Sequence, residues 1–255
     1  MKQGDFTKLA KQYINRPAYS QLLLENLLKI MEYKTKNETF QIVEVGAGTG
    51  KLTKMLLEMG LSVIAVEPND AMREEGIKYT NKFENVQWLK GSGEETGIKD
   101  NIADWVIMAS SFHWTDPQKS LPEFARILKS EGYFTAMWNP RNIKISEFHT
   151  NIEENIKKIV PELKRVSSGI QSTQEWEYVL VSTGDFKNCF FMETDHMELM
   201  SKERYMGAWH SVNDIQVQAG VQRWNEIIAM IEKEIKDLEI IEVPYKIRAW
   251  TAKKV

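Results

Sequence analysis

The fold is decided by the stretch Gln41-Ile42-Val43-Glu44-Val45-Gly46-Ala47-Gly48-Thr49-Gly50. Its first five residues are mainly apolar, which predicts a short buried strand that stops at Gly46. Apolar residues then recur at three- and four-residue spacing and predict a helix with a C-cap near Gly60; they are Leu52, Met55, Leu56 and Met59. The stretch is therefore a strand, a glycine loop and a helix, and the glycines let a ligand approach the backbone closely.

Strands and helices continue to alternate on both sides of this unit. We expect strands at residues 61–66, 86–89, 105–109 and 133–138, and helices at residues 20–33, 71–79 and 121–132. The strands are almost continuously apolar, which is typical of a parallel sheet buried on both faces. The sequence therefore predicts an α/β fold with helices on both sides of one sheet.

The pattern changes after Pro140. Charged helices are predicted at residues 146–160 and 209–238, with an extended segment at 188–199 between them and a closing strand at 243–252. This excursion is too long for a plain connection, so we interpret it as a cap on the sheet, with an added surface layer as the alternative. We expect one domain over 1–255, made of a core (1–140), a cap (141–240) and a closing strand (241–255).

Composition excludes several classes of protein. The 255 residues are 42% hydrophobic and carry a net charge of -3, which gives no electrostatic reason to expect nucleic acid or an anionic membrane as partner. The polar N-terminus and the lack of an apolar run of about 20 residues predict a soluble, cytoplasmic protein without a secretory signal. Cys189 is expected to pack in the interior, and the four scattered histidines predict no metal site.

The glycine spacing narrows the ligand. A dinucleotide fingerprint would place its third glycine at position 51, which is Lys51, and a phosphate-binding P-loop would need Ser or Thr where Leu52 stands. Glu67 ends the second predicted strand, where a carboxylate can accept both hydroxyls of a ribose. A helix-start charge before Pro68 is the alternative interpretation of Glu67. The loop and Glu67 together predict a ligand that contains a ribose but is not a dinucleotide.

Several motifs follow this loop in order. They are Glu67-Pro68-Asn69, Gly91-Ser92-Gly93-Glu94-Glu95, Ala103-Asp104-Trp105-Val106 with Ser110-Ser111-Phe112-His113-Trp114, and Phe124-Ala125-Arg126-Ile127-Leu128 continuing to Gly132-Tyr133. Together with residues 43–50 they resemble class I S-adenosylmethionine-dependent methyltransferases. The resemblance covers about residues 1–140. It implies a Rossmann-like, doubly wound, mostly parallel seven-stranded sheet with an antiparallel final strand and a helical cap.

The His113-Trp114 pair is similar to the small-molecule branch of that family, which includes proteins like trans-aconitate methyltransferases. Members often begin with Tyr-x-x-x-Arg-Pro, and here Tyr13-Ile14-Asn15-Arg16-Pro17 is one residue shorter. The resemblance implies that S-adenosyl-L-methionine is bound and S-adenosyl-L-homocysteine released. The residues that it implies for cofactor binding are Tyr13, Arg16, Glu44, Gly46, Ala47, Gly48, Thr49, Gly50, Glu67, Pro68, Ser92, Gly93, Glu94 and Ser110.

The acceptor side carries weaker signals. His113 is the candidate general base, with a purely structural role as the alternative. Trp114, Tyr19, Trp209 and His210 are the candidate substrate residues, and a helical cap favours a small molecule as acceptor. Other aromatic residues of the cap are possible wall residues: Trp176, Tyr178, Tyr205 and Trp224.

Three other functions remain open from the sequence. A catalytically inactive binding module would keep the same cofactor fold. An NAD-dependent oxidoreductase is disfavoured by the glycine spacing, and an RNA or protein methyltransferase is disfavoured because there is no basic tail. The acceptor atom and the oligomeric state are not encoded in any motif.

Overall fold

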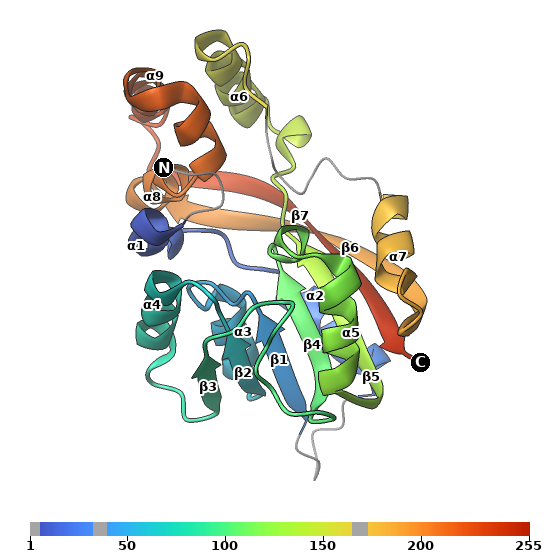
Figure 1. The fold of residues 1–255 in the computed structure, drawn as a ribbon. Coiled ribbons are helices and arrows are strands. Elements are labelled where there is room, and N and C mark those ends of the chain that lie inside the picture. The colour runs from blue at the N-terminus through green and yellow to red at the C-terminus, as the bar shows by residue number, and fades with distance from the viewer. Residues whose placement is uncertain (1–5, 33–39, 165–172) are drawn as a thin grey trace.

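The computed structural model describes residues 6–32, 40–164 and 173–255, and at its centre lies a seven-stranded sheet in the order β3-β2-β1-β4-β5-β7-β6 (Figure 1). Strands β1 to β5 are parallel, β7 runs antiparallel to β5, and β6 runs antiparallel to β7. The Rossmann-like sheet with an antiparallel final strand is therefore confirmed. The strands are β1 (Gln41–Val45), β2 (Ser62–Val66), β3 (Val86–Leu89), β4 (Ala103–Ala109), β5 (Leu128–Trp138), β6 (Phe186–Ser201) and β7 (Ile240–Lys254).

Helices cover both faces of this sheet, because side chains alternate along each strand. On one face Ile42 and Ile107 pack against α2 (Gln21–Ile30) and α3 (Lys51–Glu58). On the other face Val43 and Phe134 pack against α5 (Pro117–Ile127) and α7 (Thr173–Val181). Beside β3 lies α4 (Asp70–Thr80). The sheet is thus buried on both sides, as its apolar strands predict.

Strands β6 and β7 extend past the carboxyl end of β5. The pairing of β5 with β7 stops at Trp138 and Arg248, whereas the pairing of β6 with β7 continues to Ser201 and Ile240. The overhanging two-stranded ribbon carries the cap helices at one end of the molecule (Figure 1). These helices are α6 (Glu147–Ile159), α8 (Lys202–His210) and α9 (Asn213–Glu234), and the N-terminal α1 (Ala10–Tyr13) lies against α8.

The described residues include the short 3-10 helices Thr7–Leu9, Phe112–Trp114 and Ile143–Ile145. The second follows β4 directly, so it places the His113-Trp114 pair at the carboxyl end of that strand. No helix within the described ranges is long and apolar enough to cross a membrane.

Two helix predictions were wrong in extent. The helix expected over 121–132 ends at Ile127, because Leu128 already pairs with Ala103 in the sheet. The helix expected over 209–238 is divided: α8 ends at His210, α9 begins at Asn213, and Gly220 has a φ of 71° and kinks α9. Helix α7 was not predicted, and the predicted end of the first helix at position 33 lies outside the described residues.

Candidate active site

A cavity of about 670 Å³ opens at the carboxyl ends of β1, β2 and β4 and continues beneath the ribbon and the cap. Open parallel sheets bind their ligands at this edge. The glycine loop, Glu67 and the Ser92 loop line one half of the cavity, which we call the core half. The other half, called the cap half, is lined by Arg141, Tyr205, Trp209 and Tyr245 among others.

The glycine loop adopts a conformation that other residues rarely reach. Gly46, Gly48 and Gly50 have φ angles of 70°, 58° and 76°. A Cβ on Gly46 would also lie 2.6 Å from Cβ of Ser111, so this position has no room for a side chain. The amides of Gly46 and Ala47 both donate to the carbonyl of Val66 at 2.8 and 3.1 Å. The loop is therefore held against the end of β2, where Glu67 follows.

Glu67 is fixed by two backbone amides. Its Oε2 accepts from the N–H of Gly48 at 2.8 Å, and its Oε1 accepts from the N–H of Asn69 at 2.9 Å. The side chain is buried, and burial raises the pKa of its carboxyl in spite of these two hydrogen bonds. Each oxygen keeps a further lone pair, so the carboxylate can accept from two hydroxyl groups of a ligand in the cavity.

Glu44 is a second acid in the core half, and it is buried in a different way. It lies on β1 with an exposed fraction of 2%, and the hydroxyl of Thr53 on α3 donates to its Oε2. Burial, assisted by the nearby Glu67, raises the pKa of Glu44 to about 8. Glu44 is therefore mainly a neutral carboxyl at pH 7.

The loop after β3 is folded around Ser92. Its Oγ accepts from the amides of Glu94 and Glu95 at 3.3 and 3.2 Å. Ser92 is one of the residues expected to bind the cofactor, but these two bonds occupy the acceptor lone pairs of its hydroxyl oxygen. The amide of Gly93 has no such bond within the described residues and lines the cavity. Gly93 is thus the better placed of the two residues to contact a ligand.

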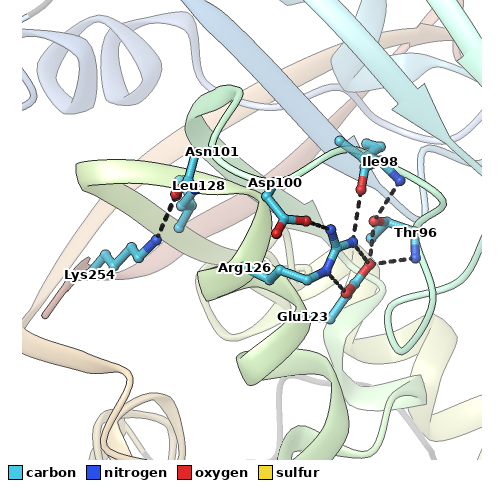
Figure 2. A network of polar contacts seen from close by, with 8 residues as sticks. All are labelled: Thr96, Ile98, Asp100, Asn101, Glu123, Arg126, Leu128 and Lys254. Carbon is cyan, nitrogen blue, oxygen red and sulfur yellow. Dashed lines mark hydrogen bonds and ion pairs between the residues drawn. The ribbon is translucent and has the colours of Figure 1, made fainter.

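An ionic network holds the segment that follows this loop against α5 (Figure 2). Arg126 on α5 contacts both Glu123 and Asp100 and donates to the carbonyl of Ile98 at 2.8 Å. Glu123 in turn accepts from the amide and the hydroxyl of Thr96. These bonds hold both ends of the Thr96–Asp100 segment against α5, and so they fix the position of the Ser92 loop.

A chain of polar contacts crosses the middle of the cavity. The hydroxyl of Tyr19 donates to Oγ of Ser110 at 3.1 Å, and that hydroxyl donates to Oδ1 of Asn139 at 3.1 Å. Nδ2 of Asn139 donates to the carbonyl of Ala18. The network joins the N-terminal segment to the ends of β4 and β5, and burial raises the pKa of Tyr19. Tyr19 therefore stays a neutral phenol.

His113 is bonded on one ring nitrogen. Nε1 of Trp138 donates to Nδ1 of His113 at 3.1 Å, and burial lowers the pKa of the imidazole to about 4. An indole nitrogen is only a donor, so Nδ1 carries no proton and the proton of the neutral ring lies on Nε2. Nε2 is then a hydrogen-bond donor. This arrangement argues against the general-base role that we considered for His113.

The N-terminal segment forms one wall of the cavity. The amide of Ala18 donates to Oε1 of Glu198 on β6 at 2.8 Å, and Nη2 of Arg16 donates to the carbonyl of Ser211 at 3.1 Å. Arg204 pairs with Glu198 at 2.8 Å; burial acts to raise the pKa of Glu198, but its contacts with His196, the Ala18 amide and Arg204 outweigh this and lower it to about 2. Glu198 is therefore a charged anchor between the segment and the ribbon.

Most of the predicted site residues line this one cavity. They are Tyr13, Arg16, Tyr19, Glu44, Gly46, Ala47, Gly48, Thr49, Glu67, Pro68, Ser92, Gly93, Glu94, Ser110, His113, Trp114 and Trp209. Their roles in binding remain predictions. Trp114 is 48% exposed at the rim, whereas Trp209 is buried in the cap half.

Two predicted residues lie elsewhere. Gly50 faces Trp88 and caps the start of α3, so it shapes the loop without lining the cavity. His210 follows Trp209 by one position on α8, which turns it away from the cavity toward the ring of Trp224.

Of the other cap aromatics only Tyr205 lines the cavity. Trp176 stacks on Trp138 at 4.4 Å in the core, and Tyr178 is 76% exposed. Trp224 packs at the edge of the core beside His210.

The sequence did not single out Asn139, Arg141 or Lys51 as cavity residues. Asn139 and Arg141 come directly after β5, and a polar residue at the carboxyl end of a buried parallel strand is the signal that would have found them. Lys51 is the first residue of α3, and burial lowers its pKa to about 8. Within the described ranges no group of His, Cys, Asp or Glu is arranged to hold a metal ion.

Comparison with known sequences agrees with this geometry. Residues 43–136 match a family model described as a methyltransferase domain. An uncharacterized methyltransferase of Mycobacterium tuberculosis is 37% identical over 105 residues, which make up 41% of this chain and 42% of that protein. The match therefore spans less than half the length of this relative.

Two solved structures share the fold. One is described as a type II methyltransferase from Anaeromyxobacter dehalogenans; it has a TM-score of 0.64 at 17% identity and covers 93% of this chain and 97% of its own. The other is phosphoethanolamine N-methyltransferase 2 of Haemonchus contortus, with a TM-score of 0.55 at 14% identity, over 97% of this chain and 57% of its own. That protein was solved with phosphomonomethylethanolamine and S-adenosylhomocysteine. At these identities the likeness establishes the fold.

Proposed function

We propose that this chain is an S-adenosylmethionine-dependent methyltransferase of class I, with residues 43–136 as its methyltransferase domain, and that it methylates a small molecule. The observation that carries the proposal is the carboxylate of Glu67, which two backbone amides hold beside the glycine loop at the edge of the cavity.

The residues present fit S-adenosylmethionine. The hydroxyl of Thr49, on the glycine loop, is buried in the cavity wall without a hydrogen-bond partner among the described residues. A buried polar group without a partner is costly, so this atom is suited to a polar ligand. Glu67 would accept from the ribose hydroxyls, and Gly93 would donate its amide to an adenine nitrogen. Met72 and Met108 supply apolar surface for the base.

When bound, S-adenosylmethionine supplies an electrophilic methyl group on a sulfonium. The residues of the chain then have to hold the acceptor in line and keep water away, which accounts for much of the acceleration of such a reaction. Tyr19, Ser110 and His113 stand between the two halves of the cavity and can orient an acceptor by hydrogen bonds. Because the neutral His113 presents a donor, the acceptor is expected to arrive already nucleophilic.

The small-molecule acceptor and the likeness to trans-aconitate methyltransferases rest on two features. The cap and the N-terminal segment cover the cap half of the cavity, and such a covered chamber suits a small acceptor better than a polymer. The His113-Trp114 pair of that branch also lines the cavity.

Calorimetry with S-adenosylmethionine, S-adenosylhomocysteine and NAD tests the proposal. We expect both sulfur compounds to bind and NAD not to bind. Transfer of a labelled methyl group is then followed across a panel of small metabolites, with a tRNA mixture and a peptide mixture as controls. Binding of NAD alone would overturn the proposal, and labelling of the polymers alone would overturn the small-molecule acceptor.

A further inference from the structure

The cap half of the cavity contains an arginine whose donors are available. Arg141 follows β5, and its guanidinium carbon lies 4.1 Å from the centre of the Trp209 ring. The nearest acid is Glu153, whose Oε1 is 3.7 Å from Nη1, too far for a hydrogen bond. The structure places no hydrogen-bond acceptor on the Arg141 side chain within the described ranges, although it lines the cavity.

Two more polar atoms in this half lack a partner. Nε of Arg16 and the hydroxyl of Tyr205 are both buried, and neither forms a hydrogen bond within the described ranges. Tyr205 has an exposed fraction of 2%, so water does not solvate it freely. Buried donors without acceptors are costly in a folded protein. Two such atoms in the wall of one cavity indicate that a bound ligand supplies their missing hydrogen bonds.

These groups lie around a common neighbour, Tyr245 on β7. The backbone of Arg141 forms a β-bridge with Tyr245. Burial raises the pKa of Tyr245, and the charges of Arg141 and Arg16 both act against this rise. The ring of Tyr205 lies 6.2 Å from that of Trp209, on which the guanidinium of Arg141 stacks, and Arg16 lines the same cavity. The arginines and Tyr205 therefore converge on one part of the cavity.

Acidic side chains in the cavity wall offset part of the positive charge of the arginines. Glu153 lies 3.7 Å from Arg141 without a hydrogen bond to it, and Asp214 lines the same half. Arg16 and Lys51 add positive charge to the lining. The donors of a guanidinium form a planar fork that matches carboxylate and phosphate oxygens, and no neutral group satisfies it as well.

We propose that the cap half binds an anionic group of the methyl acceptor, a carboxylate or a phosphate, with Arg141 as the main cation and with Tyr205 and Arg16 as further donors. This inference rests on the proposed function, because it concerns the acceptor of the same site. It makes Arg141 a residue that determines specificity. The stack on Trp209 holds the guanidinium plane in place, which reduces the entropy lost when the anion binds.

Calorimetry on the whole chain tests the inference with defined probes. The probes are benzoate, glutarate and phenyl phosphate, with benzamide as the neutral counterpart of benzoate, and each titration is run with and without S-adenosylhomocysteine. We expect at least one anion to bind about tenfold more tightly than benzamide. Benzoate or glutarate as the better ligand identifies a carboxylate, and phenyl phosphate identifies a phosphate.

Three variants locate the binding. Arg141→Gln should weaken anion binding at least about tenfold, Tyr205→Phe should weaken it a few-fold, and Arg248→Gln, whose partner is Glu193 on the ribbon surface, should leave it unchanged. Tyr205→Phe keeps the aromatic ring and its packing. It therefore still tests anion binding if Arg141→Gln lowers the stability of the protein too far for a titration.

Equal binding of anions and benzamide, or full anion binding in both Arg141→Gln and Tyr205→Phe, would overturn the inference. Failure of S-adenosylhomocysteine to bind would instead overturn the proposed function, and the titrations without it would still decide whether the cap half takes an anion.

Discussion

Trp138 donates its indole N–H to Nδ1 of His113 across 3.1 Å, and this single bond decides what the histidine can do. An indole nitrogen does not accept a hydrogen bond, so the proton of the neutral imidazole is confined to Nε2. Burial holds the imidazole neutral by lowering its pKa to about 4. His113 is thus set up to donate a hydrogen bond into the cavity.

The tautomer gives the first prediction. Nitrogen-15 spectra at pH 7 should show Nδ1 of His113 unprotonated and Nε2 protonated, because Trp138 occupies Nδ1. Trp138→Phe removes this donor but leaves the ring buried, so both neutral tautomers of His113 should become populated while its pKa stays low. Methyl transfer by the wild type should show no loss between pH 7.5 and 5.5 that is due to His113. A proton on Nδ1, or an inflection near pH 6.5 that disappears in His113→Gln, would contradict this.

Glu67 gives the second prediction. Glu67→Gln keeps the size of the side chain but replaces an acceptor oxygen with a donor that opposes the N–H of Gly48. We expect the affinity for S-adenosylhomocysteine to fall about 10- to 100-fold, because hydrogen bonds to a charged acceptor are strong. Glu95→Gln, on the exposed side of the Ser92 loop, is the control. Calorimetry measures both, and equal affinities would remove Glu67 from the site.

Glu44 predicts a dependence of stability on pH. Its folded pKa of about 8 lies above the ordinary value of 4.5, so the unfolded chain loses this proton first and stability falls as pH rises from 4.5 toward 8. Glu44→Gln removes this loss and should raise the free energy of unfolding by on the order of 1 to 2 kcal/mol more at pH 8 than at pH 5.

Denaturant unfolding at the two pH values measures the effect of Glu44→Gln. Glu242→Gln, at an exposed position of β7, is the control and should show no such difference. A stabilisation by Glu44→Gln that is the same at both pH values would show that Glu44 is ionised in the folded protein.

Glu198 gives a prediction of the opposite sign. Its folded pKa of about 2 lies below the ordinary value, so its contribution is present above pH 4.5 and is lost as pH falls toward 2. Glu198→Gln should cost about 2 kcal/mol at pH 7 and much less near pH 3. Hydrogen exchange should be faster around Ala18 in this variant. Exchange unchanged there, relative to Glu193→Gln on the ribbon surface, would show that Glu198 does not anchor the segment.

Substitution of Arg126 tests whether the network of Figure 2 positions the Ser92 loop. Arg126→Met breaks the contacts with Glu123 and Asp100 but touches no residue of the cavity wall. We expect hydrogen exchange to increase over residues 92–99 and affinity for S-adenosylhomocysteine to fall a few-fold. Lys129→Met, which breaks the ion pair of Lys129 with Asp104, is the control. Arg73→Met is unsuitable as a control because Arg73 donates to the carbonyl of Glu67. Equal exchange in both variants would limit Arg126 to a role in stability.

The core of the fold was predictable because its signals are local. Residues 41–45 form β1 as predicted, and β3 also has the predicted bounds. In these segments a buried strand and a glycine turn determine the structure within a few residues. Ser20 caps α2 through the amide of Leu23, as a serine before apolar residues indicates.

The cap was less predictable because tertiary contacts determine it. The break after His210 has no proline; it consists of the C-cap Ser211 and of Val212, whose backbone is extended before α9 begins. Which side of α8 faces the cavity depends on how the helix packs beneath the ribbon. The sequence alone therefore did not show that Trp209 lines the cavity and that His210 does not. The partner of His113 lies 25 positions away on β5, and no spacing rule reveals such a contact.

The order of the strands has a consequence for synthesis of the chain. Strand β6 is made before β7, yet it lies at the edge of the sheet and pairs only with β7. While the ribosome adds residues 202–239, the 16 residues of β6 have been synthesised but β7, with which they pair, has not. Long unpaired strands are prone to aggregate, so we expect the nascent protein to be exposed to aggregation during this interval. The ribbon beside the cap half of the cavity is therefore completed only after residues 43–136 have been translated.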